Sequence, residues 1–265
     1  MAEHQDVTYE TDRRVATISF NHPEELNTWR PAMEMAMRAA MERAAADDEV
    51  RAIVLTGKGR AFCAGASLQA LAQRAQGVSV LPPHDRRPGD LEQRYSYLLA
   101  IPKPIIAAIN GGTAGVGFCL TLYCDIRFMA ETAKLSTAFA QRGLVAEHAS
   151  AWLLPRIVGP MHAADLLYSA RRIDGCEAEK IGLARCLPTE GFLQAVQDYA
   201  AQIANHSSPR AVRLMKQQLW EAQHQTLAEA THWSEDEIVK CRDTEDYAEG
   251  SAHFLEKRAP NFTGR

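Results

Sequence analysis

The sequence IPKPIIAAINGGTAGVGFCLTLYCDIR, residues 101–127, decides the fold expected for this chain. Residues 104–124 carry no charged side chain, yet Asn110-Gly111-Gly112 interrupts the apolar run, so a membrane span is disfavoured. The run divides into a β-branched strand over 105–110, a turn that Gly111 and Gly112 permit at positive φ, and an apolar segment over 115–124. We therefore predict a strand, a glycine turn and a buried helix.

The start of this predicted helix is the first candidate for function. Gly115 and Gly117 would lie in its first turn, where N–H groups have no intrahelical partner and the helix dipole favours negative charge. An anion, or an oxygen that becomes negative during a reaction, would be stabilised there. The same glycines could instead serve only to let the helix pack closely on a sheet, and this stretch alone leaves both interpretations open.

Length and composition are those of an ordinary globular protein. The 265 residues can bury a large core, and 46% of them are apolar and 23% charged. The net charge of -4 and the pI near 6.1 give no basic surface for nucleic acid. The N-terminal residues lack the apolar core of a signal peptide, and we expect a cytoplasmic protein with neither a nucleic-acid nor a membrane partner.

The cysteines and glycine clusters exclude two further classes of site. The six cysteines form no C-x-x-C pair and have no histidine cluster at ligand spacing, so we predict free thiols and no metal site. Gly57-Lys58-Gly59 lacks the Walker spacing, and residues 112–117 read G-x-x-G-x-G, which is the wrong order for a dinucleotide fingerprint. A phosphate-binding loop for a nucleotide is therefore disfavoured.

The chain before residue 101 alternates between strand and helix, which indicates an α/β fold. Residues 7–20 predict a hairpin, 31–46 an amphipathic helix with proline in its first turn, and 51–56 a buried strand. Residues 61–68 then repeat the order of extended chain, glycine and helix start. Residues 76–90 are rich in glycine, proline and arginine without periodicity, and we predict a surface loop placed to act as a lid.

The rest of the chain is mostly helical. We predict strands over 126–130, 134–137 and 184–187, and helices over 91–100, 149–158, 161–169, 177–181, 192–205, 209–222 and 227–255, the last with one break. Residues 1–200 would form the core with the ligand site. Residues 201–265 would form a helical region for oligomerisation.

With both glycine stretches placed, the chain resembles the enoyl-CoA hydratase/isomerase (crotonase) superfamily over nearly its whole length. The matching motifs are IVLTG (53–57) with AFCAGASL (61–68), PIIAAING (104–111), CD (124–125), RGL (142–144), LPRIVG (154–159), and FLEKR (254–258) with NF (261–262). The resemblance implies a spiral of ββα turns, closed by C-terminal helices that mediate homotrimers and often hexamers that are dimers of trimers. It implies coenzyme A as part of the substrate and no separate cofactor.

The resemblance also places a substrate site. The two N–H groups of the family's oxyanion hole fall on Ala66 and Val116, where a thioester carbonyl would gain a few kcal/mol per donor as its oxygen becomes negative. Family members usually have glycine at the second position, and the donor survives in Val116 if its φ is negative. The predicted substrate-binding residues are Phe62, Ala64, Ala66, Ser67, Leu68, Gly115, Val116, Phe139, Phe254 and Lys257, with Phe254 and Lys257 on the tail that reaches coenzyme A in the family.

The chain departs from the pattern of the family's hydratases, which carry two catalytic glutamates. The positions that match those glutamates hold Cys119 and Phe139 here, and neither side chain can be the acid or base that adds water to an enoyl double bond. Glu147 instead matches the position of the single acid in family members that shift double bonds or isomerise epoxide rings on CoA thioesters. One carboxylate suffices for that work, because it can take a proton from one carbon and return it to another.

Alternatives to a proton-shuttling isomerase remain at this point. Glu147 could only cap the helix that follows it, or could hydrate an enoyl thioester together with His148, Asp85 or Asp90. The chain could also bind acyl-CoA without turnover. Cys119 is predicted to be a buried thiol rather than a nucleophile, His148 to pack or face solvent, and Asp125 and Arg142 to hold structure.

Overall fold

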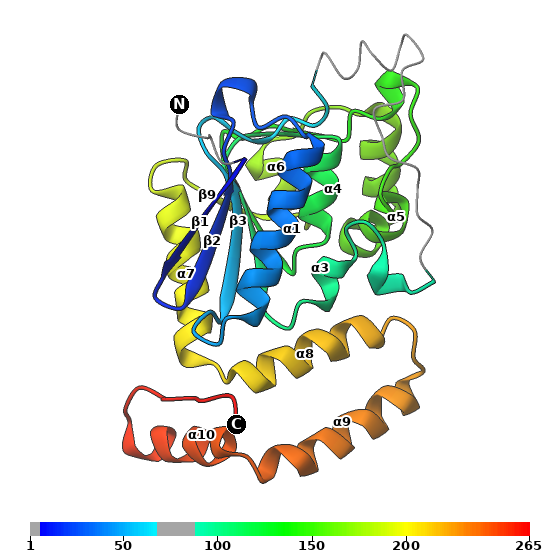
Figure 1. The fold of residues 1–265 in the computed structure, drawn as a ribbon. Helices are drawn as coiled ribbons and strands as arrows, with labels where there is room; N and C mark the ends of the chain where they lie inside the picture. Colours follow the sequence, from blue (N-terminus) through cyan, green and yellow to red (C-terminus); the bar gives the residue numbers. More distant parts are fainter. Residues whose placement is uncertain (1–5, 68–87) are drawn as a thin grey trace.

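The structure is a computed structural model that describes residues 6–67 and 88–265 (Figure 1), and its strands form two sheets. The larger sheet has the strand order β1-β2-β3-β5-β7-β9, and the smaller has the order β4-β6-β8. Apart from the β1/β2 hairpin, neighbouring strands run parallel. The strands are β1 (Val7–Asp12), β2 (Val15–Phe20), β3 (Ala52–Gly57), β4 (Ala61–Cys63), β5 (Ile105–Ile109), β6 (Gly112–Ala114), β7 (Ile126–Ala130), β8 (Leu135–Ser136) and β9 (Arg185–Leu187).

From β3 onward, consecutive strands alternate between the two sheets, which is the ββα spiral expected from the sequence. β3, β5 and β7 each enter the large sheet, and each is followed by a short strand of the small sheet. The helices are α1 (Pro31–Ala46), α3 (Tyr97–Ala100), α4 (Val116–Leu122), α5 (Ser150–Ser169), α6 (Gly175–Lys180), α7 (Phe192–His206), α8 (Pro209–Glu221), α9 (Leu227–Arg242) and α10 (Glu245–Glu256). The α/β class and the crotonase-like spiral are thereby confirmed.

The core lies at the middle of the large sheet. Every residue of β3 and β5 is buried, because the two parallel strands are covered on both faces, and this accounts for their unbroken apolar sequences. The buried hydroxyl of Thr56 has a hydrogen-bond partner inside this core, because it donates to the carbonyl oxygen of Ala108 at 2.9 Å. At the edge of β5, the Asp125 carboxylate accepts from the Ile105 N–H at 2.7 Å and from Lys216 of α8 at 2.8 Å, so Asp125 holds structure.

The glycine turn of the central stretch differs from the prediction. Gly111 and Gly112 do not have positive φ, so that expectation was wrong, and the left-handed residue is Gly115 at φ 54°. Gly112 begins β6 instead. Gly111 is required by space, because a Cβ there would lie 2.2 Å from the carbonyl oxygen of Arg60.

Three other segments refine the sequence expectations. Residues 91–100 do not form one helix: a 3-10 turn, Asp90–Glu92, is followed by non-helical residues and the short α3, because the Gln93 N–H bonds to the Ser96 hydroxyl instead. The helices predicted over 149–158 and 161–169 are joined as α5, with non-helical backbone at Gly159. The predicted lid loop lies outside the described residues from 76 to 87.

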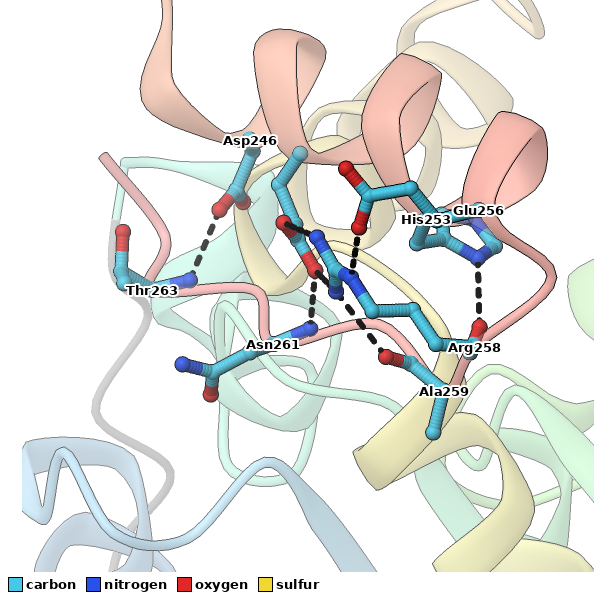
Figure 2. Close-up of polar contacts among 8 residues, drawn as sticks. Asp246, His253, Glu256, Arg258, Ala259, Asn261 and Thr263 are labelled. Atoms are coloured by element: carbon cyan, nitrogen blue, oxygen red, sulfur yellow. Dashed lines mark hydrogen bonds and ion pairs between the residues drawn. The ribbon is translucent and has the colours of Figure 1, made fainter.

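The C-terminal helices lie below the sheets, with α10 at the end of the chain (Figure 1). The tail after α10 folds back along that helix (Figure 2). Glu249 accepts two hydrogen bonds from the Arg258 guanidinium and one from the Asn261 N–H, which lower the pKa of Glu249 to about 2. The buried Asp246 accepts from the Thr263 N–H at 2.8 Å. The boundary predicted at residue 200 and the oligomeric role of this region stay predictions.

Gly117 offers a test of how tightly α4 packs on β4. A Cβ at this position would lie 2.2 Å from the carbonyl oxygen of Cys63, so we expect Gly117→Ala to destabilise the fold by about 1–3 kcal/mol despite the better helix propensity of alanine. Gly112→Ala is the matched control, because its Cβ would meet only the Cβ of Ala61 at 3.8 Å. Thermal unfolding measures both variants, and equal melting temperatures would contradict the close packing.

Candidate active site

Two glycine turns meet where β4 and β6 end. Gly65 (φ 84°) follows β4, and Gly115 (φ 54°) follows β6. A Cβ on Gly65 would lie 2.9 Å from the carbonyl oxygen of Ala114 and 3.7 Å from the Cα of Gly115, so the two main chains are in direct contact. Ala66 and Val116, the residues that follow these glycines, therefore begin at neighbouring positions in space.

Both following residues have an N–H group available for a ligand. Val116 is the first residue of α4, where N–H groups have no intrahelical acceptor. Within the described residues, no acceptor is recorded for the N–H of Ala66, and the adjacent carbonyl of Gly65 is held by the Trp29 N–H at 2.8 Å. Val116 does not have positive φ, so valine keeps the donor that glycine usually supplies in the family. That the two donors bind one oxygen stays a prediction.

The Glu147 loop is tied to the same helix. The carbonyl of Glu147 accepts from the Cys119 thiol at 3.4 Å, and Cys119 lies one turn after Val116 on α4. The next carbonyl, of His148, accepts from the Tyr123 hydroxyl at 2.9 Å. Glu147 is half-buried and lies three residues before the start of α5 at Ser150. The predicted acid is thus brought beside the first turn of α4.

The residues after Glu147 have unusual backbone geometry. His148 and Ala149 both have positive φ, at 49° and 57°, although neither is glycine. Left-handed conformations of non-glycine residues cost energy and often occur at functional sites. The bonds to Cys119 and Tyr123 fix this turn, and the His148 ring packs edge-on against Tyr95 at 4.8 Å.

Cys119 is a poor nucleophile in this setting. Its side chain is buried, and burial raises the pKa of the thiol well above its usual value of 9.0, with a further increase from the negative charge of Glu147. Because the thiolate is the reactive form, the raised pKa leaves this thiol inert.

A polar cluster that the sequence did not reveal lies next to these elements. Glu34 of α1 accepts hydrogen bonds from the Arg94 guanidinium (2.7 Å from Nε, and a second from Nη2), from Trp29 Nε1 at 3.3 Å and from the Tyr95 hydroxyl at 3.3 Å. Burial would raise the pKa of Glu34, but the Arg94 hydrogen bonds and charge outweigh it and hold the pKa below its usual 4.5. Four residues separated by up to 66 positions leave no motif in the sequence, which is why this cluster was missed.

This Glu34 cluster touches both halves of the site. Trp29 donates its backbone N–H to Gly65 and pairs with Ala66, and Tyr95 packs on His148. The pKa of Arg94 is raised first by its hydrogen bond to Glu34, and to a smaller extent by the charges of Tyr95 and Glu147. One carboxylate on α1 therefore links the predicted oxyanion donor to the loop that carries the predicted acid.

The remaining predicted residues fall into three groups. Phe62 and Phe139 are buried in the core, with Phe62 edge-on to Phe20 at 5.4 Å. Ala64 and Ser67 are half-buried beside the Gly65 turn, and Leu68 lies outside the described residues.

Phe254 and Lys257 belong to the third group and are not close to the others. Both are exposed, at the end of α10. The tail after this helix is tied to the start of β3, where Arg51 donates to the carbonyl of Phe262, whereas the Gly65 turn follows the far end of that strand. A single chain therefore does not bring the tail to the Gly65 and Gly115 turns.

The described parts of the chain give two further findings. Over residues 6–67 and 88–265, no group of three or more His, Cys, Asp or Glu side chains is arranged to hold a metal ion. In the same ranges, no helix combines the length and apolar character needed to cross a membrane.

The fold and the paired glycine turns define a class of α/β proteins with a crotonase-like spiral, and comparisons with known proteins specify it further. The sequence model of the enoyl-CoA hydratase/isomerase family matches residues 10–265. The chain belongs to this family and is thus a member of a family of acyl-CoA enzymes.

Some relatives of the chain are named isomerases and others hydratases. The chain is 31% identical to the 1,2-epoxyphenylacetyl-CoA isomerase of Escherichia coli K12, over 96% of this chain and 97% of that one. Among solved structures, an enoyl-CoA hydratase from Bacillus anthracis has a TM-score of 0.85 at 28% identity, over 98% of this chain and 100% of the other. An enoyl-CoA hydratase/isomerase from Mycobacterium paratuberculosis has a TM-score of 0.86 at 28% identity, over 99% and 100%.

The Glu34 cluster leads to a prediction about stability and pH. Because the fold lowers the pKa of Glu34, its charge stabilises the protein above about pH 4.5, and this contribution is lost as the pH falls through the lowered value. We expect Glu34→Gln to cost about 1–3 kcal/mol at pH 7 and less at pH 3.5.

Thermal unfolding between pH 7 and pH 3.5 measures this difference. Glu42→Gln is the matched control, because Glu42 lies on the same helix in a mostly exposed pair with Arg38. A Glu34→Gln effect of constant size across this pH range would contradict the charge-based account.

Proposed function

We propose that this chain shifts a double bond in an acyl-CoA thioester, with Glu147 as the single acid and base. The observation that carries the proposal is the convergence at α4: Val116 is the first residue of the helix, so its N–H has no acceptor within the helix, the Gly65 turn touches the N-cap, and the Glu147 loop is bonded to Cys119 of the same helix. Coenzyme A would enter only as part of the substrate, and no separate cofactor is needed.

The chemistry needs no co-reactant. Glu147 would remove a proton from the carbon next to the thioester carbonyl of a 3-enoyl-CoA, and the electron pair would move onto the carbonyl oxygen between the N–H groups of Ala66 and Val116. The resulting dienolate would take the same proton back at the γ-carbon. The double bond thereby moves from position 3 to position 2, and Glu147 returns to its carboxylate form.

The two-acid hydratase mechanism finds little support in the site. Cys119 and Phe139, at the positions of the two usual glutamates, are both buried, and one is an inert thiol and the other a hydrocarbon. Hydration stays the second candidate because solved relatives are named hydratases and Asp90 lines a pocket together with His148. Asp90 could then be the second acid beside Glu147. Acyl-CoA binding without turnover is the third.

The position of α10 favours an oligomer of identical chains. If Phe254 and Lys257 contact coenzyme A, the site they reach would belong to a neighbouring copy of the chain, because their own tail is tied to the other end of β3. Large apolar side chains are exposed along the C-terminal helices, as a subunit interface requires. They include Leu219, Leu227, Val239 and Phe254. We therefore propose a homotrimer, or a hexamer made of two trimers.

Replacing Glu147 by Gln tests the proposed acid. We expect Glu147→Gln to abolish turnover of a 3-enoyl-CoA and to change the affinity for coenzyme A only a few-fold, because the amide keeps the shape of the carboxylate but cannot accept the proton. The exposed Glu190→Gln is the matched control and should retain full activity. Product identity by chromatography, with 2-enoyl-CoA and water offered in parallel, distinguishes isomerisation from hydration. An unchanged rate for Glu147→Gln would reject the assignment, and binding without any turnover of the wild type would favour the third candidate.

Replacing Val116 by Pro tests the backbone donor. Proline is well tolerated at the first position of a helix but has no N–H, so Val116→Pro removes the proposed donor and leaves α4 able to form. We expect kcat for Val116→Pro to fall roughly 100- to 1000-fold below that of Val116→Ala, which keeps the donor. Circular dichroism of both variants checks the fold. Equal rates in the two variants would show that this N–H does not stabilise the reacting oxygen.

A further inference from the structure

A pocket of about 570 Å³ begins where the Glu147 loop ends. His148 and Ala149, the two residues after Glu147, both line it, and so does Arg94, whose pKa responds to the Glu147 charge among others. This volume lies in the range of small-molecule binding pockets. An acyl group whose reacting carbons lie at Glu147 could extend into this pocket.

Nearly half of the residues that line the pocket carry aromatic rings. Four parts of the chain supply them: the segment before α3, the C-cap of α4, the start of α5 with the loop before it, and the end of α8 with the turn after it. We call this the ring pocket, and its rings belong to Tyr95, Tyr123, His148, Trp152, Trp220 and His224.

The rings hold one another in place. Tyr95 packs against Tyr123 at 6.5 Å and edge-on to His148 at 4.8 Å. In a second group of rings, Trp152 lies 5.6 Å from Trp220 and is stacked with His224, with ring centroids 6.0 Å apart and an interplanar angle of 11°. Long aliphatic side chains are scarce among the residues that line the pocket, with Leu99 and Leu153 as the examples.

This lining favours one chemical class of occupant. A flat ring gains about 0.5–1.5 kcal/mol per aromatic contact beyond the area it buries, whereas an alkyl chain gains only the burial. A carboxylate at the end of the acyl group would meet Asp90, and Arg94 is already bonded to Glu34. The ring pocket therefore suits an uncharged aromatic group.

We propose that the ring pocket binds the aryl end of the acyl group, so that aryl-substituted acyl-CoA thioesters are the substrate class of this protein. The proposal rests on the proposed function only in taking Glu147 as the site of reaction. Two observations carry it. Six aromatic rings line the pocket, and His148 and Ala149, which follow Glu147 in the chain, belong to the same lining.

The test compares an aryl and an alkyl substrate of the same reaction. With the full chain, kcat/KM is measured for 4-phenyl-3-butenoyl-CoA and 3-hexenoyl-CoA. We expect Trp220→Leu and Trp152→Leu to lower the aryl value by roughly 3- to 10-fold more than the alkyl value. Trp220→Phe, which keeps a ring, should retain most of the preference. Trp233→Leu on α9 is the control for removal of a tryptophan outside the pocket and should change neither value.

Binding of unreactive thioesters separates this proposal from the proposed function. Isothermal titration gives Kd for phenylacetyl-CoA and hexanoyl-CoA in the wild type and in Trp220→Leu, with no turnover required. We expect tighter binding of phenylacetyl-CoA in the wild type and loss of that preference in Trp220→Leu. Equal affinities for the two ligands in the wild type, or equal losses in the variant, would overturn the ring pocket assignment even if Glu147 proves essential. An active Glu147→Gln enzyme would instead overturn the proposed function.

Discussion

The close approach of main chains between successive turns of the spiral is the constraint on which the rest of the structure depends. Three glycines make it possible, because a Cβ at Gly65, Gly111 or Gly117 would lie between 2.2 and 2.9 Å from a carbonyl oxygen of the neighbouring turn. Interiors tolerate no such overlap, and backbone carbonyls cannot move aside as a flexible side chain can. The glycines therefore allow close packing, and the residues that follow two of the close contacts are Ala66 and Val116, the proposed hydrogen-bond donors.

The close packing explains why the predicted acid must be supplied by a separate loop. Helix α4 is buried and has no acidic residue of its own, and the two positions at which hydratases of the family carry glutamates hold the buried Cys119 and Phe139. The loop before α5 reaches this helix from outside and is pinned by the Cys119 thiol and the Tyr123 hydroxyl. Its left-handed residues, His148 and Ala149, carry a conformational cost that these contacts offset. In the proposed reaction, function would depend on two turns of the spiral, at Gly65 and Gly115, and on the Glu147 loop.

The sequence predicted the elements well where burial and local chemistry agree. Strands β3 and β5 are continuous apolar runs, and α1 begins at a proline, so their bounds could be read within a residue or two. It failed at residues 111–112, where neither glycine has positive φ and Gly111 is needed for space. It also failed at 93–96, where the local bond from the Gln93 N–H to the Ser96 hydroxyl and the bonds of Arg94 and Tyr95 to Glu34 replace the helix. The Glu34 cluster and the ring pocket join segments far apart in sequence, so no local pattern could indicate them.

The Glu34 cluster also bears on how Glu147 could act as a base. A carboxylate bonded to a guanidinium through two hydrogen bonds holds a proton poorly, because both the charge and the bonds favour its ionised form. Arg94 has such a bonded partner in Glu34, and within the described residues no hydrogen bond to the Glu147 carboxylate is recorded. Arg94 can therefore act on Glu147 only through its charge, which Glu34 largely neutralises. A catalytic base must accept a proton as well as release it. The strong ion pair with Arg94 is formed by Glu34, which transfers no proton in the proposed reaction, and not by Glu147.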